Sequence, residues 1–197
     1  SRATTMTAAQ YNMFTTVSNA AAGTLTDAGT LALNTSIVSL TLANGTNNVT
    51  ASSTGAAYTL TGGTGADTFN FGGDLITSGD GIDGGSGTDT LNVTGTTAID
   101  ASDLNGIANI DTVNFANTTT AVAWTSQDND ASAAMTVDAS SLTTGVATLN
   151  FSDETTGSAI TLIGGAAGDT LTGGAGADNI IGNAGGDTIL DGDGIDT

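Results

Sequence analysis

The chain has no cysteine, no histidine and no proline, and its one basic residue stands against 20 acidic ones, which gives a net charge of −19 over 197 residues. Without histidine or cysteine it has no imidazole base and no thiol nucleophile, and it cannot build the usual zinc, haem or iron–sulfur sites. Nucleic-acid binding needs a cationic surface, and Arg2 is the only fixed cation. No apolar run has the length of a membrane span, and no signal-peptide pattern opens the sequence. The composition therefore predicts an acidic chain with no nucleic-acid partner and no membrane span.

Aromatic residues make up 4 % of the chain and hydrophobic residues 38 %, so a core is possible only if it is thin and built from small aliphatic side chains. The 29 glycines do not indicate disorder, because Leu, Ile and Val recur at short, even intervals between them. This texture predicts many short strands joined by tight turns.

A short strand signature recurs along the chain. Three copies begin 22 residues apart, at Asp67–Phe71, Asp89–Val93 and Asp111–Phe115, and a fourth copy without the Asp covers Thr148–Phe151. Apolar and polar residues alternate within each copy, so the apolar side chains face inward while Thr and Asn face outward. A fixed period of this size predicts stacked coils, as in a solenoid.

A second repeat relates residues 99–115 to residues 137–151. We interpret the two as versions of one module, with an insertion around 116–136 between them. That insertion contains Trp124, for which we expect a packing role.

The N-terminal segment differs from the rest. Thr7 and Gln10 have the spacing of a capping box, which predicts a short packing helix over residues 8–18. Residues 23–60 are rich in Thr, Gly and Asn with alternating apolar runs, which predicts further strands.

A nine-residue pattern, Gly-Gly-x-Gly-x-Asp-x-apolar-x, is the motif that points to metal binding. It occurs without mismatch at Gly62–Asn70, Gly84–Asn92 and Gly173–Ile181, and imperfect copies begin at Gly164, Gly182 and Asp191. The result in the last block is a strict nine-residue spacing of four acidic residues, Asp169, Asp178, Asp187 and Asp196.

The pattern has a direct physical reading. Glycines permit a tight turn whose peptide carbonyls point toward a common centre, and the Asp at the sixth position adds a carboxylate. Ligation by oxygen alone is what Ca²⁺ prefers, whereas zinc and copper favour nitrogen or sulfur. The alternative interpretation is that each Asp only caps the backbone of its own turn.

These units resemble the nonapeptides of repeats-in-toxin (RTX) proteins, and the arrangement as a whole resembles modules of bacterial calcium-dependent S-layer proteins exported by type I secretion. The resemblance implies an all-β fold, a right-handed parallel β-roll or β-helix solenoid stabilised by calcium, in which two nonapeptides form one coil. It also implies that Asp169 stacks on Asp187 along one edge and Asp178 on Asp196 along the other.

Two further acidic residues, Asp80 and Asp83, lie in a segment that parallels residues 191–196, and we include both among the candidate ligands. The carboxylates are Asp67, Asp80, Asp83, Asp89, Asp169, Asp178, Asp187 and Asp196; the carbonyl candidates, at the first and third positions of each unit, are Gly62, Thr64, Gly84, Ser86, Gly164, Ala166, Gly173, Ala175, Gly182 and Ala184.

The charge pattern makes calcium part of the expected fold. Stacked carboxylates about 4 Å apart repel by about 4 kcal/mol per pair at an effective dielectric constant of about 20, which a thin core cannot offset repeatedly. We expect expanded Gly-rich blocks without calcium and stacked coils with it.

Four segments result: 1–60 with the helix and Thr-rich strands, 61–93 as the first RTX block, 94–163 as linking coils, and 164–197 as the second, truncated RTX block. Because the sequence ends inside a nonapeptide, we expect it to be a piece of a longer chain. The nucleophile elbow and the HExxH zinc motif are both missing, so we expect no catalysis.

Two functions remain open. In the first, the chain is an extracellular structural module of a bacterial cell-surface lattice, such as an S-layer, that self-associates through calcium-bridged contacts and can meet a cell-surface polysaccharide. In the second, it is an extension or ligand-binding module of an RTX adhesin that presents a Thr-rich face to a glycan or, as a weaker candidate, to ice. We favour the first because no ligand pocket is evident in the sequence.

Overall fold

The structure, a computed structural model, describes residues 4–6, 23–25, 30–33, 39–51, 57–72, 75–95, 97–116, 120–126, 131–155 and 157–197. The helix predicted over residues 8–18 lies outside the described residues. No helix occurs within the described ranges, so none there is long and apolar enough to cross a lipid bilayer.

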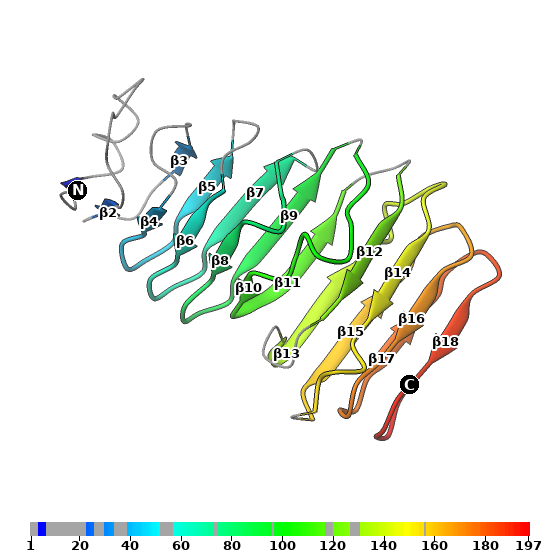
Figure 1. The fold of residues 1–197 in the computed structure, drawn as a ribbon. Coiled ribbons are helices and arrows are strands. Elements are labelled where there is room, and N and C mark those ends of the chain that lie inside the picture. The colour runs from blue at the N-terminus through cyan, green and yellow to red at the C-terminus, as the bar shows by residue number, and fades with distance from the viewer. Residues whose placement is uncertain are drawn as a thin grey trace.

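Short parallel strands build the fold, and Figure 1 shows them stacked in chain order from the N-terminal to the C-terminal end. Their bounds are β1 Thr4–Met6, β2 Gly23–Leu25, β3 Thr30–Leu33, β4 Ser39–Thr41, β5 Asn48–Ala51, β6 Thr59–Thr61, β7 Thr68–Gly72, β8 Gly81–Asp83, β9 Thr90–Thr94, β10 Ile107–Ala108, β11 Ile110–Phe115, β12 Val122–Thr125, β13 Ala131–Asp138, β14 Ala147–Asn150, β15 Ala159–Ile163, β16 Thr170–Thr172, β17 Asn179–Ile181 and β18 Thr188–Leu190.

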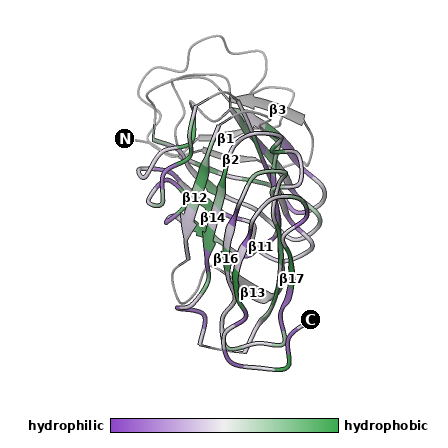
Figure 2. Cartoon of the chain, turned by 90° about the vertical axis from the view of Figure 1, so that its right-hand side faces the viewer, coloured by the Kyte–Doolittle hydropathy of each residue, from purple (hydrophilic) through white to green (hydrophobic). Residues whose placement is uncertain are grey.

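Three sheets arise because the chain passes alternately from one side of the stack to the other. The odd-numbered strands from β3 to β17 form one eight-stranded sheet that runs along the stack. On the opposite side, β1, β2, β4, β6, β8 and β10 form a six-stranded sheet, and β12, β14, β16 and β18 form a four-stranded one. Every pairing between these strands is parallel, which confirms the predicted all-β parallel solenoid; Figure 2 looks along the stack, so that successive coils overlap.

The sequence periods correspond to coil lengths. Phe69 is in register with Leu91, and Leu91 with Val113, so the 22-residue repeat is one full coil. In the last block Leu171 is in register with Ile189, 18 residues later, so two nonapeptides make one coil there. The fourth copy of the strand signature, which lacks the Asp, lies in β14 on the opposite side of the stack from the first three.

One coil joins the six-stranded sheet to the four-stranded sheet, which both lie opposite the eight-stranded sheet. Between β9 and β11 the chain first forms a parallel bridge from Ile99 forward to Val122, and then forms β10, which pairs back with β8. We call residues 97–108 the seam, because the six-stranded sheet ends here and the four-stranded sheet begins.

The segment around 116–136, predicted as an insertion, supplies β12 and β13 as strands of the stack, and β13 pairs with β11 through one register shift between Ile110 and Thr112. Trp124 is fully buried and packs edge-to-face on Phe151, with ring centroids 5.0 Å apart. The expected packing role of Trp124 is therefore confirmed.

The core is a thin layer between the sheets, as the composition predicts. Inward positions alternate with outward ones along β7 and β9, and the apolar residues of the first three strand signatures are buried: Phe69, Phe71, Leu91, Val93, Val113 and Phe115. At the far end Ile189 on β18 is 47 % exposed, since no described coil follows it.

The outer face of the eight-stranded sheet is regular and uncharged over much of its length. Five half-buried threonines lie in register on neighbouring strands, Thr68, Thr90, Thr112, Thr136 and Thr161. Beside them an amide ladder runs across four strands, in which the Nδ2 of each residue donates to the Oδ1 of the one before it, at 2.8–2.9 Å: Asn48, Asn70, Asn92 and Asn114.

Trp124 provides a test of the packing. Its Nε1 is buried without a hydrogen-bond partner among the described residues. Trp124→Ala should lower the free energy of unfolding by about 3–5 kcal/mol because it opens a cavity. Trp124→Phe should cost less than half as much, because it keeps the ring contact with Phe151 and removes an unpaired donor. Urea unfolding at one fixed calcium concentration measures both, and equal losses would contradict the packing described here.

Candidate metal centre

Each sixth-position Asp except Asp196 lies directly before a strand, where the chain turns from one sheet to the next. Its carboxylate reaches back to the previous coil and accepts a backbone N–H from the corresponding position there. Asp67 Oδ1 accepts the N–H of Asn47 at 2.8 Å, Asp89 Oδ1 that of Asp67 at 2.8 Å, and Asp111 Oδ2 that of Asp89 at 2.6 Å. A corner N–H has no carbonyl above it in the ladder, so the carboxylate satisfies a donor whose burial would otherwise cost about 1–3 kcal/mol.

The last block repeats this arrangement at two corners. Asp169 Oδ1 accepts the N–H of Ala147 at 2.7 Å, and Asp187 Oδ1 accepts that of Asp169 at 2.9 Å. At the other corner Asp196 Oδ1 accepts the N–H of Asp178 at 2.8 Å. The stacking of Asp169 with Asp187 and of Asp178 with Asp196, expected from the resemblance, is present.

Asp80 and Asp83 lie at opposite ends of β8 and do not form one cluster. Asp80 makes the same contact as the other corner residues, because its Oδ1 accepts the N–H of Tyr58 at 2.6 Å. Asp83 instead accepts from the N–H of Gly85 at 3.0 Å and from Nδ2 of Asn109 at 2.8 Å.

The second carboxylate oxygen faces its own turn. Oδ2 accepts the N–H of Gly165 at 2.7 Å in Asp169, and that of Gly174 at 2.9 Å in Asp178. The capping role weighed as the alternative interpretation is therefore present in these two turns. It does not exclude a metal, because a carboxylate offers about four lone-pair positions.

The first glycine of each unit leaves space in which oxygen atoms converge. A methyl group built on Gly164 would lie 2.5 Å from Asp169 Oδ2 and 2.8 Å from the carbonyl oxygen of Gly182 on the next coil. A methyl group built on Gly62, Gly84 or Gly173 would likewise approach both the Asp of its own unit and a carbonyl oxygen of the next coil. At Gly182 it would approach only the Asp of its own unit. A carboxylate and a main-chain carbonyl facing one point are the donors that a hard cation prefers.

The third-position carbonyls differ between the two blocks. In the first block they already accept inter-coil hydrogen bonds, from the N–H of Gly45 to Thr64 O at 2.5 Å and from that of Gly65 to Ser86 O at 2.7 Å. In the last block they belong to the turns between the two sheets, at Ala166, Ala175 and Ala184.

The corners bury charge without a counter-charge. Asp67, Asp89, Asp169 and Asp178 are each 1 % exposed, while the one basic side chain, Arg2, lies outside the described residues. Successive coils of parallel strands lie about 4.8 Å apart, at which two carboxylates repel by about 3–4 kcal/mol at an effective dielectric constant of about 20. In the described part of the chain no three acidic side chains converge as a metal site, so a cation at a corner would need ligands other than carboxylates, such as main-chain carbonyls and water.

Asp89 is the most perturbed of these groups. Its Oδ2 is buried and has no hydrogen-bond partner among the described residues. Burial raises the pKa of Asp89 above its ordinary value of 3.8, and the charges of Asp67, Asp111 and Asp83 raise it further, against a backbone hydrogen bond that lowers it. Burial and the neighbouring charges therefore both act against the ionised form of Asp89.

Two members of the stack lie outside the nonapeptides and were not predicted as site residues. Asn47 donates through both N and Nδ2 to Asp67 Oδ1, and Asp111 continues the column on the other side of Asp89. The signal for Asp111 is its position as first residue of the third strand signature, the place that Asp67 and Asp89 hold in theirs.

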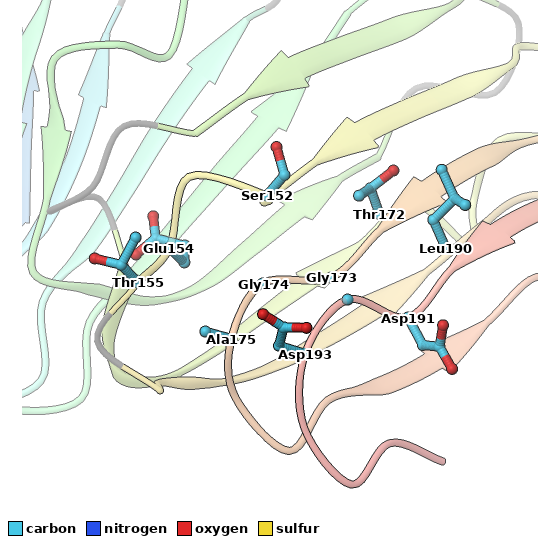
Figure 3. A pocket seen from close by; sticks show the side chains of 11 residues that line it. Ser152, Glu154, Thr155, Thr172, Gly173, Gly174, Ala175, Leu190, Asp191 and Asp193 are labelled. Carbon is cyan, nitrogen blue, oxygen red and sulfur yellow. The ribbon is translucent and has the colours of Figure 1, made fainter.

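A hollow of about 500 Å³, which the sequence did not indicate, lies at the corner between β14 and β15. Three successive turns line it, as Figure 3 shows, and its polar side chains are all acidic or hydroxyl-bearing: Ser152, Glu154, Thr155, Thr172, Asp191 and Asp193. Glu154 is buried, whereas Asp191 and Asp193 are exposed.

Comparison with known proteins adds no relative: no family model, no curated protein and no solved structure matches the chain.

The first-position glycine can be tested against a glycine in an open place. Gly164→Ala should lower the free energy of unfolding by about 1–3 kcal/mol, because the methyl group would press on Asp169 Oδ2 and Gly182 O. Gly186→Ala is the matched control, since no described atom lies within 4 Å of its methyl group and a small gain of about 0.4–1 kcal/mol is expected there. Chemical denaturation in calcium compares the two; similar effects would show that the first position does not need its space.

Asp89 makes the calcium-free fold sensitive to pH. Its raised pKa means that the folded chain binds the proton more tightly than the unfolded chain, so this contribution to stability is present at low pH and is lost as pH rises above about 4 through the folded pKa. In EDTA, where the Gly-rich coils are expected to be mostly expanded, the folded fraction measured by circular dichroism should therefore show a downward slope between about pH 4 and pH 7. Asp89→Asn should flatten that slope; an unchanged slope would place the pH dependence on other groups.

Proposed function

We propose that this chain is a calcium-binding, non-catalytic structural module of an extracellular bacterial surface layer or a similar self-assembling protein, and that calcium drives both its folding and its assembly. One observation carries the proposal: columns of buried carboxylates face main-chain carbonyls at the corners of the solenoid, with no basic side chain among the described residues to neutralise them. A bound cation resolves both the repulsion and the burial of charge.

Calcium is the cation that the donors favour. The converging atoms are carboxylate and carbonyl oxygens, which suit a hard cation, and Ca²⁺ accepts the irregular oxygen shells that a turn provides more readily than Mg²⁺ does. Asp67, Asp89, Asp169 and Asp178 would hold the ions, together with the carbonyl groups that face the first-position glycines. Bound calcium would supply positive charge between coils and would link each turn to the next.

Membership of the RTX group, export by type I secretion and an extracellular location belong to the same proposal. A chain whose coils need calcium stays expanded where calcium is scarce and folds where it is millimolar, because binding to the folded state adds directly to its stability. The nonapeptide pattern at residues 62–70, 84–92 and 173–181 supports this assignment.

Self-association is supported by the C-terminal end of the stack. There, among the described residues, β18 presents an unpaired edge, the outer edge of β17 is bonded only at Thr197, and apolar side chains are exposed: Ile181 at 41 %, Ile189 at 47 % and Leu190 at 56 %. A further parallel coil, in this chain or in another copy, would cover these side chains and pair both edges.

One observation favours a second candidate, the adhesin module. From β5 to β11 the aligned threonines and the amide ladder give the outer face of the eight-stranded sheet a regular repeat of hydroxyl and amide groups. Such a face can hydrogen-bond to a polysaccharide, with ice as a weaker candidate. In that role the module would fold with calcium and remain monomeric.

Sedimentation velocity separates these possibilities. The purified chain, first in EDTA and then across a calcium titration into the millimolar range, should become compact and then form larger species, with magnesium as the control. Compaction without association would favour the adhesin module. A boundary that does not change with calcium would contradict the proposal as a whole and leave the glycine turns as structural elements only.

A further inference from the structure

We propose that the corner where the turn after β8 stacks on the turn before β11 holds a divalent cation in a site that extends beyond the nonapeptide repeat and uses Asp89, Asp83 and the main chain of Asn109. This inference rests on the proposed function, since it assigns one particular calcium site. It differs from the repeat pattern because the second turn, between β10 and β11, is not a nonapeptide.

Asn109 takes the place that a first-position glycine would hold in the next coil. It is one of two non-glycine residues with a positive φ in the described ranges, at 52°, a conformation that Asn tolerates better than most residues. This backbone directs the carbonyl oxygen of Asn109 to the open side of Gly84, where a methyl group would overlap it and would lie 2.7 Å from Asp89 Oδ2. Two acceptor oxygens therefore face the same small space.

The side chain of Asn109 holds a third possible metal-ligating group, the carboxylate of Asp83, at this corner. Its Nδ2 donates to Asp83 Oδ1 at 2.8 Å, and the N–H of Gly85 donates to the same oxygen at 3.0 Å. These two hydrogen bonds fix the Asp83 carboxylate at the outer edge of the corner. Asp83 lies close enough to Asp89 for its charge to raise the pKa of that carboxyl.

The unpartnered oxygen distinguishes this corner from its equivalents. Asp89 is 1 % exposed, and its Oδ2 has no hydrogen-bond partner among the described residues, whereas the same atom of Asp169 and of Asp178 accepts an N–H of its own turn. A buried anionic oxygen that faces a carbonyl oxygen needs a positive group between them. Carboxylate and carbonyl donors select Ca²⁺, and water would complete its coordination.

A proton is the competing occupant. A protonated Asp89 could donate from Oδ2 to the carbonyl oxygen of Asn109 and would satisfy both atoms without a metal. The two occupants differ in what they require of Asp83: a cation uses its negative charge, while a proton on Asp89 does not need it.

Calcium counting on the full chain decides between them. Equilibrium dialysis and isothermal titration calorimetry with Ca²⁺ at pH 7 would compare the unaltered chain with Asp89→Asn, Asp83→Asn and the control Asp153→Asn, an exposed carboxylate of the same charge. Asp89→Asn should bind one ion fewer, and Asp83→Asn should weaken one site about 10-fold or more. Asp153→Asn should bind as the unaltered chain does, and circular dichroism in saturating calcium checks that every variant is folded.

The other outcomes distinguish a failure of the proposed function from a failure of this inference. If the unaltered chain binds no calcium, the proposed function itself fails. If it binds calcium and both corner variants bind as it does, the proton occupies the corner and the inference is overturned. A loss in Asp89→Asn alone would return the ion to an ordinary nonapeptide turn and would overturn the extension to Asp83 and Asn109.

Discussion

The hydrogen bond from a corner N–H to the carboxylate of the next coil is the interaction on which this fold depends. Strands of two to eight residues leave many peptide groups at corners, where the sheet ladder is interrupted. At β7, β8, β9, β16, β17 and β18 an Asp stands directly before the strand and reaches the preceding coil, where it helps to fix the register of one coil on the next. In the Gly-rich blocks the same residues stack buried negative charges on successive coils. The geometry that defines the solenoid is thus also the reason why we propose a bound cation.

Period and alternation are local properties, and they made the stacked coils and the inward residues predictable from the sequence. The parallel direction, the two-nonapeptide coil and the stacking of Asp169 on Asp187 were implied by the resemblance to RTX nonapeptides. The seam could not be predicted, because it depends on whether Ile99 pairs forward or backward, a choice made between distant strands. Nor did the pattern indicate Asn47 as a member of the Asp column, because Asn47 is not an Asp and joins the column by donating hydrogen bonds to Asp67 on the next coil.

The imperfect nonapeptides also have a physical explanation. Glycine serves two separate needs in these turns: space at the first position, and a left-handed backbone at later positions such as Gly65 and Gly87. Ala167 stands at a fourth position whose φ is not positive, so the side chain is tolerated there. Asn183 adopts a φ of 64° in place of a second glycine, and its Nδ2 donates to Gly164 O. Each departure from the pattern falls where its particular need is relaxed or met in another way.

The seam gives the stack a mechanical property. Along the eight-stranded sheet β9, β11 and β13 are paired over several residues each, with one register shift between Ile110 and Thr112, whereas on the opposite side one bridge, between Ile99 and Val122, joins the two sheets across this coil among the described residues. Resistance to bending is therefore unequal on the two sides. We therefore expect the stack to bend at the seam, with the eight-stranded sheet acting as the hinge. A force across the stack would separate the six-stranded and four-stranded sheets at residues 97–108, while the coils at either end keep their shape.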